Sequence, residues 1–381
     1  MTEWKTYRLG DVCSRLRSGR GIPASEVSTC GKFAVVGGNG VRGYTDTSNF
    51  NGQCVVVGRQ GAYCGNVRYF DGEFYMTEHA VVIVGNELAD THFLAYLLST
   101  MHLGQLSAQS AQPGLSVQTL SKLEISLPGL EKQRRIAGIL GAIDDKIENN
   151  RRINTNLELQ AQALFDEWLC KVNTIKGTFN DIIDATLAGD WGQETLQGNY
   201  THEVYCIRGA DIPALRNGDK GKMPIRYILE RNYLVKQLRA NDIVVEISGG
   251  SPTQSTGRVC MITKSLLDRL GKDVVCTNFC RAITPKNGYA IFIFLYWQML
   301  YNKNTMFSYE NGTTGIKNLN IADLISKEPI NVPKQEDVDK LNVVLQPIYD
   351  QIYANGLQNE TLATLRDTLL PKLMNGEIKT E

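Results

Sequence analysis

The sequence predicts an α+β protein in which two mixed α/β domains are separated by two long antiparallel coiled-coil helices, with an internal repeat of approximate two-fold symmetry. The chain of 381 residues is longer than one ordinary hydrophobic core, so two or three domains are expected. Two segments, 130–172 and 334–381, match without a gap when one is shifted by 205 positions. Both carry apolar residues at alternating steps of four and three, which is the pattern of coiled-coil helices.

The repeat divides the chain into four segments, in which each helix follows one domain. The two domains resemble each other less than the two helices do. A protein built as domain, helix, domain, helix is expected to do one thing at two places. The expected segments are a first domain at 1–129, a central helix at 130–172, a second domain at 173–333 and a distal helix at 334–381.

The first domain is expected to contain short strands joined by glycine-rich turns. Lys32–Val36, Cys54–Val57 and Ala80–Val84 are rich in apolar and β-branched residues and are followed by glycine-containing turns, which favours strands. Thr91–Thr100 is apolar and lacks glycine and proline, so a helix is expected there. A last strand is expected at Lys122–Leu127.

The second domain is expected to repeat the first with longer loops. Matching segments lie 170 residues apart near the start of the two domains and 201 apart near their ends, which indicates insertions in the second copy. The matches pair Leu9–Val12 with Phe179–Ile182, Gln53–Val57 with Asn241–Val245, Phe93-Leu94 with Phe294-Leu295, and Pro113–Leu115 with Thr314–Ile316.

Each long helix is expected to present one apolar seam. About 40 residues at a rise of 1.5 Å give a rod of roughly 60 Å. Pro347 lies inside the second helix and removes a backbone hydrogen bond, so we expect that helix to break and restart there. The seam residues are Ile136, Leu140, Ile143, Ile147, Asn150, Asn154, Leu157, Ala161, Leu164 and Trp168 in the first helix, and Leu341, Leu345, Ile348, Ile352, Asn355, Asn359, Leu362, Arg366, Leu369 and Leu373 in the second.

Both seams are interrupted by two asparagines. If the helices pack antiparallel about their midpoints, Asn150 lies opposite Asn359 and Asn154 lies opposite Asn355. A buried asparagine costs stability, but it selects one register because its amide must find a hydrogen-bonding partner. The alternative is that the four asparagines face solvent at a local twist of the seam. The register interpretation predicts a helix pair with one domain at each end.

Composition excludes several classes of protein. Net charge is zero, but the segment from Cys13 to Arg68 holds seven basic and two acidic residues, so any positive surface is expected on the domains. Nine cysteines without paired spacing, and no signal peptide, predict reduced thiols in a cytoplasmic protein. The four histidines show no metal-ligand spacing with the cysteines, so no metal is expected. No apolar run approaches the roughly 20 residues that a membrane span needs.

Two helical motifs resemble conserved regions of the specificity subunit of type I restriction-modification enzymes. The resemblance covers essentially the whole chain. The central motif is Leu127-Pro128 with Glu131-Lys132-Gln133-Arg134-Arg135-Ile136, Ile143-Asp144 and Ile147. The distal motif is Val332-Pro333 with Leu365-Arg366-Asp367 and Leu369-Leu370-Pro371-Lys372-Leu373-Met374-Asn375-Gly376-Glu377-Ile378.

The resemblance implies two target-recognition domains, each of which reads half of a bipartite sequence in double-stranded DNA. It implies that the helix pair spaces these domains and docks two modification (methyltransferase) subunits, which two restriction subunits then join. It implies no catalytic residue and no cofactor in this chain, because S-adenosylmethionine is bound by the modification subunits. The sequence agrees, since it contains no Asn/Asp-Pro-Pro-aromatic methyltransferase motif, no Walker loop and no nuclease motif.

Glycine-rich loops in both domains are the candidate DNA-binding sites. Glycine lets the backbone approach the duplex, arginine can read guanine, and glutamine or asparagine can read adenine. The alternative is an ordinary hairpin loop with solvated polar residues. The candidates are Arg59, Gln60, Tyr63, Asn66 and Arg68 in the first domain and Ser248, Ser251, Gln254, Ser255, Thr256 and Arg258 in the second. Weaker candidates, for phosphate contact, are Arg17, Arg20, Arg42 and Lys317.

Two other functions are compatible with parts of the sequence. The long helices alone would suit an assembly scaffold whose domains bind proteins or peptides. Arginine and glutamine in glycine loops of both domains favour DNA over that interpretation. A free-standing enzyme is disfavoured by the missing catalytic motifs.

Overall fold

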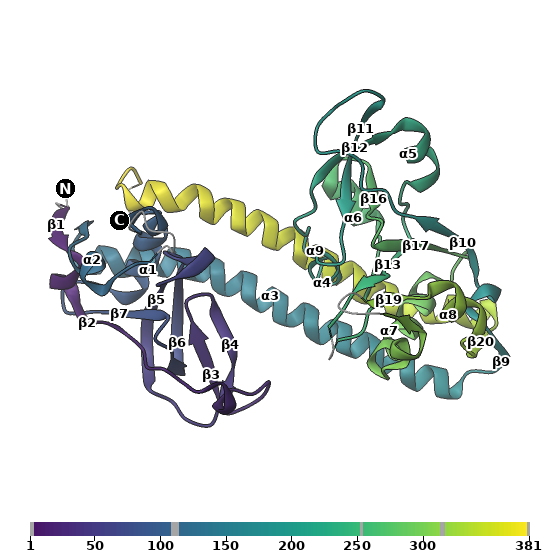
Figure 1. The fold of residues 1–381 in the computed structure, drawn as a ribbon, viewed down its shortest axis with the longest axis horizontal. Coiled ribbons are helices and arrows are strands. Elements are labelled where there is room, and N and C mark those ends of the chain that lie inside the picture. Colours follow the sequence, from purple (N-terminus) through teal and green to yellow (C-terminus); the bar gives the residue numbers. More distant parts are fainter. Residues whose placement is uncertain (1–3, 108–113, 252–253, 313–316, 379–381) are drawn as a thin grey trace. The chain divides into compact units, whose positions relative to one another are not determined.

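The computed structural model describes residues 4–107, 114–251, 254–312 and 317–378. It confirms the α+β class, with two β-rich domains and two long helices that pack together, α3 (Leu130–Lys171) and α9 (Gln335–Met374) (Figure 1). The chain forms two compact units. The first combines Met1–Asp145 with Ala363–Glu381, and the second is Lys146–Leu362, so each unit holds one domain and part of both helices.

The first domain is built on a six-stranded sheet with strand order β2-β7-β5-β6-β3-β4, and β1 pairs separately with β8. Sheet neighbours are antiparallel except for β3 and β6, which are parallel. The elements are β1 (Lys5–Arg8), η1 (Leu9–Val12), β2 (Cys13–Ser18), η2 (Ala24–Glu26), β3 (Phe33–Gly37), β4 (Gly40–Thr45), β5 (Phe50–Gly58), η3 (Gly61–Tyr63), β6 (Val67–Met76), β7 (Ala80–Gly85), α1 (Thr91–Ser99), η4 (Leu103–Leu106), α2 (Val117–Ser121) and β8 (Glu124–Leu127).

Apolar side chains cover both faces of this sheet. Successive residues of β5 point to opposite faces, so Val55 and Val57 join the core beneath α1, whereas Cys54 and Val56 join a smaller core on the other face. The helix predicted at Thr91–Thr100 is confirmed as α1. It begins where the side chain of its N-terminal cap, Asp90, accepts a hydrogen bond from the backbone of the first turn.

The second domain has a four-stranded sheet of order β10-β17-β13-β15 and smaller sheets of order β12-β11-β16, β14-β19-β18 and β20-β9. Its elements are β9 (Thr174–Gly177), η5 (Phe179–Asp181), β10 (Ile183–Ala188), β11 (Tyr200–Ile207), α4 (Ile212–Arg216), β12 (Ile225–Leu229), α5 (Glu230–Lys236), β13 (Ile243–Glu246), β14 (Ser248–Gly249), β15 (Val259–Met261), α6 (Lys264–Leu270), β16 (Val274–Cys276), β17 (Cys280–Pro285), α7 (Ala290–Asn302), η6 (Thr305–Tyr309), β18 (Glu310–Asn311), β19 (Lys317–Leu319), α8 (Ile321–Lys327) and β20 (Ile330–Pro333).

The two domains share one strand topology, as the growing sequence shift predicts. Strands β2, β3, β5 and β7 correspond to β10, β11, β13 and β17, and α1 corresponds to α7. The long strand β6 corresponds to β15 and β16, which the inserted helix α6 separates. Equivalent backbone hydrogen bonds align the residues of the two domains. Arg20 N–H donates to the Met76 carbonyl oxygen in the first domain, and Asp190 N–H donates to the Cys276 carbonyl oxygen in the second. The predicted match at Thr314–Ile316 lies outside the described residues.

The two helices run antiparallel in the second unit, where both asparagine pairs meet. Asn150 Nδ2 donates to Asn359 Oδ1 at 2.9 Å, and Asn355 Nδ2 donates to Asn154 Oδ1 at 2.7 Å. All four side chains are buried. These are the pairs named above from the sequence, and their part in selecting the register stays a prediction.

The predicted break of the distal helix at Pro347 is wrong, because α9 is continuous from Gln335 to Met374. Pro347 is exposed, whereas Leu345 and Tyr349 on either side are buried. Packing therefore holds the helix across the proline, and the carbonyl that loses its partner is on the face open to water.

The predicted seam is also wrong at one position. Leu164 is 41% exposed, and Phe165 is fully buried in its place. Phe165 packs against Phe292 and Tyr296 of α7. The end of α3 therefore turns its apolar side toward the domain. The strand predicted at Lys122–Leu127 is shorter in the structure, because it begins at Glu124, after helix α2.

Candidate nucleic-acid interface

Three turns of the first domain meet at one end of its sheet. A Cβ on Gly38, in the β3–β4 turn, would lie 3.0 Å from Gly58 Cα and 2.9 Å from the His79 carbonyl oxygen. Gly58 ends β5, and His79 lies in the β6–β7 turn. A side chain at Gly38 would separate these backbones, so glycine brings the flanking polar residues to one surface.

The loop after β5 has a well-bonded backbone and available side chains. Arg59 N–H donates to the His79 carbonyl oxygen at 3.1 Å, and the Arg59 carbonyl accepts from Leu115 N–H at 2.8 Å. Gln60 is exposed, and Tyr63 is 54% exposed. Main-chain bonds therefore hold this loop in place, and the side chains of Gln60 and Tyr63 are open to a ligand, whereas that of Arg59 is half-buried.

Arg68, at the start of β6, reaches the same surface. A Cβ on Gly40 would lie 3.0 Å from Arg68 Nη1, and Arg68 Nη2 donates to Asn39 Oδ1 at 3.5 Å. Arg42 is exposed on β4, next to this turn, and Asn66 is half-buried at the end of the loop. Sequence reasoning did not single out Asn39, although its place in a glycine-rich turn was an available signal.

Arg17 and Arg20 lie on and just beyond β2, which is the edge strand farthest from β4 in the sheet. Arg17 pairs with Val82 of β7, and its side chain is exposed. Arg20 follows the strand and is also exposed. In the strand order, β7 separates Arg17 from β5 and the loop of Arg59. Arg20 is nearer to that loop, because its N–H donates to the Met76 carbonyl oxygen beside the β6–β7 turn, where the His79 carbonyl oxygen accepts from Arg59 N–H.

Several predicted residues of the second domain are instead parts of its interior. Ser255 is 4% exposed and Thr256 is fully buried. The Glu310 carboxylate accepts from Thr256 N–H at 2.6 Å and from Thr256 Oγ1 at 2.9 Å, and it pairs with Lys317 Nζ at 3.1 Å. These bonds hold β18 and β19 to the preceding loop. They leave Ser255 and Thr256 without access to a duplex, and Lys317 with its charge neutralised.

Arg258 has a similar internal partner. Its guanidinium binds both oxygens of Glu246, with Nε to Oε2 at 2.7 Å and Nη2 to Oε1 at 2.6 Å. Among the other predicted residues, Ser248 on β14 bonds the Asn318 side chain, Ser251 closes a turn with Gln254, and Gln254 is exposed. The accessible part of this predicted site is therefore narrower than the sequence suggests.

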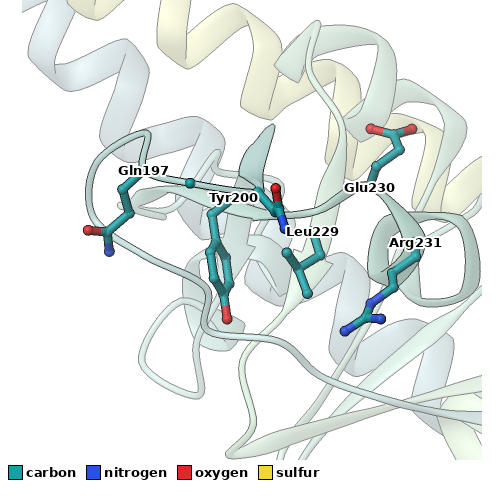
Figure 2. Close-up of a pocket in the computed structure, with 7 residues that line it drawn as sticks. Gln197, Tyr200, Leu229, Glu230 and Arg231 are labelled. Atoms are coloured by element: carbon teal, nitrogen blue, oxygen red, sulfur yellow. The ribbon is translucent and has the colours of Figure 1, made fainter.

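A pocket of about 710 Å³ lies beside the antiparallel strand pair β11–β12 of the second domain. Figure 2 shows Leu229 between the side chains of Tyr200 and Arg231, with Gln197 on the preceding turn. Tyr200 of β11 pairs with Leu229 of β12. The pocket combines an aromatic ring, an amide and a guanidinium, and nothing in the sequence pattern singled it out.

His202 on β11 lies between two carboxylates, with Nδ1 2.6 Å from Glu230 Oε2 and Nε2 2.8 Å from Asp273 Oδ2. Burial lowers the pKa of His202, but the two carboxylates outweigh it and raise the pKa above its ordinary value of 6.5. The protonated ring therefore stabilises the fold fully below pH 6.5, and this contribution is lost as pH rises through the folded-state pKa.

We expect the melting temperature of the wild type to fall relative to that of His202→Gln as the pH is raised from about 6 to about 8.5. Scanning fluorimetry at constant ionic strength measures both proteins. A difference between them that is constant across this range would show that the two carboxylates do not hold a proton on His202.

Within the described ranges, no helix combines the length and the apolar character needed to cross a membrane. The same residues contain no group of three or more histidine, cysteine, aspartate or glutamate side chains arranged to hold a metal ion.

Comparison with known proteins gives a consistent result. A family model described as the type I restriction modification DNA specificity domain matches residues 1–159 and 209–362. The chain is 38% identical over 146 residues to the type I restriction enzyme EcoprrI specificity subunit of Escherichia coli, covering 37% of this chain and 36% of that protein. It is 23% identical to the type I restriction enzyme HindI specificity subunit of Haemophilus influenzae, covering 99% of this chain and 100% of that protein. The crystal structure of a type I restriction-modification S subunit from M. genitalium has the same fold, with a TM-score of 0.57 and 18% identity over 98% of this chain and 96% of that one.

Proposed function

Because the chain belongs to the family of type I restriction-modification DNA specificity subunits, which are not catalytic, we propose that its two β-rich domains each read one half of a bipartite double-stranded DNA target. The observation that carries this proposal is the surface of the first domain that presents Arg42, Arg59 and Arg68. Within the described part of the chain, none of the three pairs with a carboxylate. Guanidinium groups free of carboxylates can bind guanine edges and phosphates.

The second half-site is assigned to the second domain. Its accessible polar groups lie in the β14 loop, where Ser251 and Gln254 sit, and in the pocket around Tyr200 and Arg231. Glutamine and arginine are suited to adenine and guanine respectively. Since the two domains carry different residues on a shared topology, the two half-sites are expected to differ in sequence.

The helix pair is proposed to dock two modification subunits, which bind S-adenosylmethionine, and two restriction subunits are proposed to join them in the cytoplasm. Ile139 and Val344 occupy the same repeat position, 205 residues apart, and are 40% and 54% exposed. Equivalent exposed apolar side chains suit two copies of one partner. Native mass spectrometry of the complex purified from its host is expected to give two modification subunits for each copy of this chain.

The alternative is an assembly scaffold whose domains bind proteins or peptides. A gel-shift assay with modification subunits and a randomised duplex library separates the two functions. DNA recognition predicts a retarded species enriched in one split sequence. A scaffold predicts no retarded species with any duplex.

Replacing Arg59 with alanine is expected to weaken binding to the cognate duplex by roughly 10- to 100-fold, because a bidentate base contact contributes about 1–3 kcal/mol of discrimination. Binding to random DNA should change little. Fluorescence anisotropy on cognate and scrambled duplexes measures both affinities, once methylated positions in the host genome have defined the target. Arg152→Ala, on the exposed side of α3, is the matched control. Equal losses on both duplexes would make Arg59 a phosphate contact.

A further inference from the structure

Three arginines line the open edge of the first domain's sheet. Arg15 and Arg17 lie two residues apart on β2, the terminal strand of the sheet order, so their side chains share one face. They pair with Val84 and Val82, whose side chains belong to the face that carries the smaller core. Arg20 lies two residues beyond the end of the strand, and its N–H donates to the carbonyl oxygen of Met76. We call Arg15, Arg17 and Arg20 the arginine edge.

Arg15, which the sequence did not single out, is the most constrained member of this set. Its Nε atom is buried and has no hydrogen-bond partner, and the centre of its guanidinium lies 4.9 Å from the centre of the Phe50 ring. Burial and then the charges of Arg17 and Arg20 lower the pKa of Arg15. The positive charges of Arg17 and Arg20 thus both act on the guanidinium of Arg15.

Two carboxylates of the same domain each have another partner through one oxygen, whereas the second oxygen of Glu78, Oε2, has no hydrogen-bond partner. Asp71 Oδ2 accepts from Gln53 Nε2 at 3.0 Å, and Glu78 Oε1 lies 3.3 Å from His79 Nε2. Within the described ranges, none of the three arginines forms an ion pair with a carboxylate. Clustered positive charge without internal compensation is a site for an external anion.

The corresponding edge of the second domain is built differently. The shared register places Ala185 at the position of Arg15, Leu187 at that of Arg17 and Asp190 at that of Arg20. Helix α5, which has no counterpart in the first domain, covers this edge: Asn232 Nδ2 and Lys236 Nζ bind Asp190 Oδ2 at 2.7 and 3.1 Å. The second domain therefore closes and neutralises the edge that the first domain leaves open and positive.

We propose that the arginine edge binds backbone phosphates of DNA beside the first half-site, and that the second domain makes no equivalent contact. The inference rests on the proposed function, since it assigns a further contact to the same DNA. It makes the two halves of the subunit unequal: the first domain supplies a larger, sequence-independent share of the affinity. Arginine suits this role because its planar, permanently charged group binds phosphate oxygens in pairs.

The test measures how DNA affinity depends on salt. The full chain, in complex with its modification subunits, is titrated into a labelled duplex that carries the cognate site, at several salt concentrations. Each lost phosphate contact lowers the slope of log K against log salt by about 0.9, so Arg15→Gln/Arg17→Gln should lower it by roughly 1.8. Affinities for cognate and scrambled duplexes should fall by similar factors. Lys5→Gln/Arg8→Gln removes the same charge from exposed positions of β1 in the same domain and should leave the slope unchanged.

Arg17→Gln/Arg20→Gln changes only exposed side chains and serves if the substitution at Arg15 prevents folding. An unchanged slope in a folded variant, or an equal change in the β1 control, would show that the arginine edge does not bind phosphates. It would leave the proposed DNA recognition intact. A wild-type complex that binds no duplex overturns the proposed function and this inference together. A fall confined to the cognate duplex assigns these residues to base reading and also overturns the inference.

Discussion

Replacing Gly356 with alanine is expected to destabilise the second unit by roughly 3 kcal/mol, because the added methyl group has no space to occupy. A Cβ at Gly356 would lie 2.5 Å from the Gly218 carbonyl carbon and closer still to its oxygen. Gly218 itself has φ +78° and lies against the Ile352 carbonyl, so the loop cannot retreat without breaking its own contacts. Alanine is favoured over glycine inside a helix by only about 1 kcal/mol, so the clash outweighs this gain and the net change in stability is a loss.

The loop that Gly356 accommodates is fixed to the helices by charged groups. Arg269 Nη1 donates to the Gly218 carbonyl oxygen at 2.8 Å, and Lys220 Nζ donates to Glu360 Oε1 at 2.9 Å. Displacing the loop would disrupt both. Urea unfolding of the full chain, followed by circular dichroism, measures the change.

The matched control is Gly138→Ala, another glycine inside a long helix, where an added Cβ meets no atom within 4 Å. This variant is expected to be more stable than the wild type by up to about 1 kcal/mol, through helix propensity alone. Opposite signs for the two alanine substitutions support close docking at Gly356. A stabilising effect at both positions would show that the loop is not seated on α9.

Replacing Asn154 with leucine is expected to cost about 3 kcal/mol, because several buried polar groups lose their partner at once. Asn154 Nδ2 donates to the carbonyl oxygens of Asn217 at 2.9 Å and Ile352 at 3.0 Å, and Asn154 Oδ1 accepts from Asn355. Leucine has a similar volume but cannot replace any of these bonds. Asn149→Leu, five residues earlier on the exposed side of α3, should change stability by less than about 0.5 kcal/mol.

The double variant Asn154→Leu/Asn355→Leu separates stability from register. Replacing both members of a buried pair removes the unsatisfied amide, so part of the lost stability should return. If the pair selects the register, the double variant should also show less specific helix pairing, visible as broadened methyl resonances of neighbouring Ile352 in NMR spectra. A double variant as unstable as Asn154→Leu would instead assign the cost to the bonds that Asn154 donates to the Asn217 and Ile352 carbonyl oxygens.

The sequence was informative where a pattern repeats along one element. The helices and the asparagine positions follow from periodicity and from the shift of 205 residues, and the shared domain topology follows from the shift that grows from 170 to 201 residues. Prediction from the sequence failed where contacts between distant elements decide which residues are buried and where a helix continues. Phe165 replaces Leu164 in the core because α7 packs on that side, and α9 passes Pro347 because its buried face is held on both sides.

The candidate site shows the same division. A glycine-rich loop predicts an accessible backbone, and the loop of Arg59 is of that kind. The loop around Thr256 has a similar composition, but Glu310, 54 residues further along the chain, accepts a hydrogen bond from Thr256 and holds the loop in the interior. The neutralisation of Arg258 by Glu246 likewise depends on a strand pairing that sequence spacing does not encode. Arg15 was overlooked because exposure and charge compensation are properties of the assembled sheet.

The boundary between the two units has a consequence for exchanging target specificity between relatives. It falls inside both helices, at Asp145 and Leu362, and not where the helices join the domains. A hybrid cut at the ends of the helices would part the loop of Gly218 from the glycine that receives it. A hybrid joined in mid-helix would keep each domain together with the helical residues of its own unit. The natural modules for recombination are therefore a domain and the helical halves beneath it, transferred as one piece.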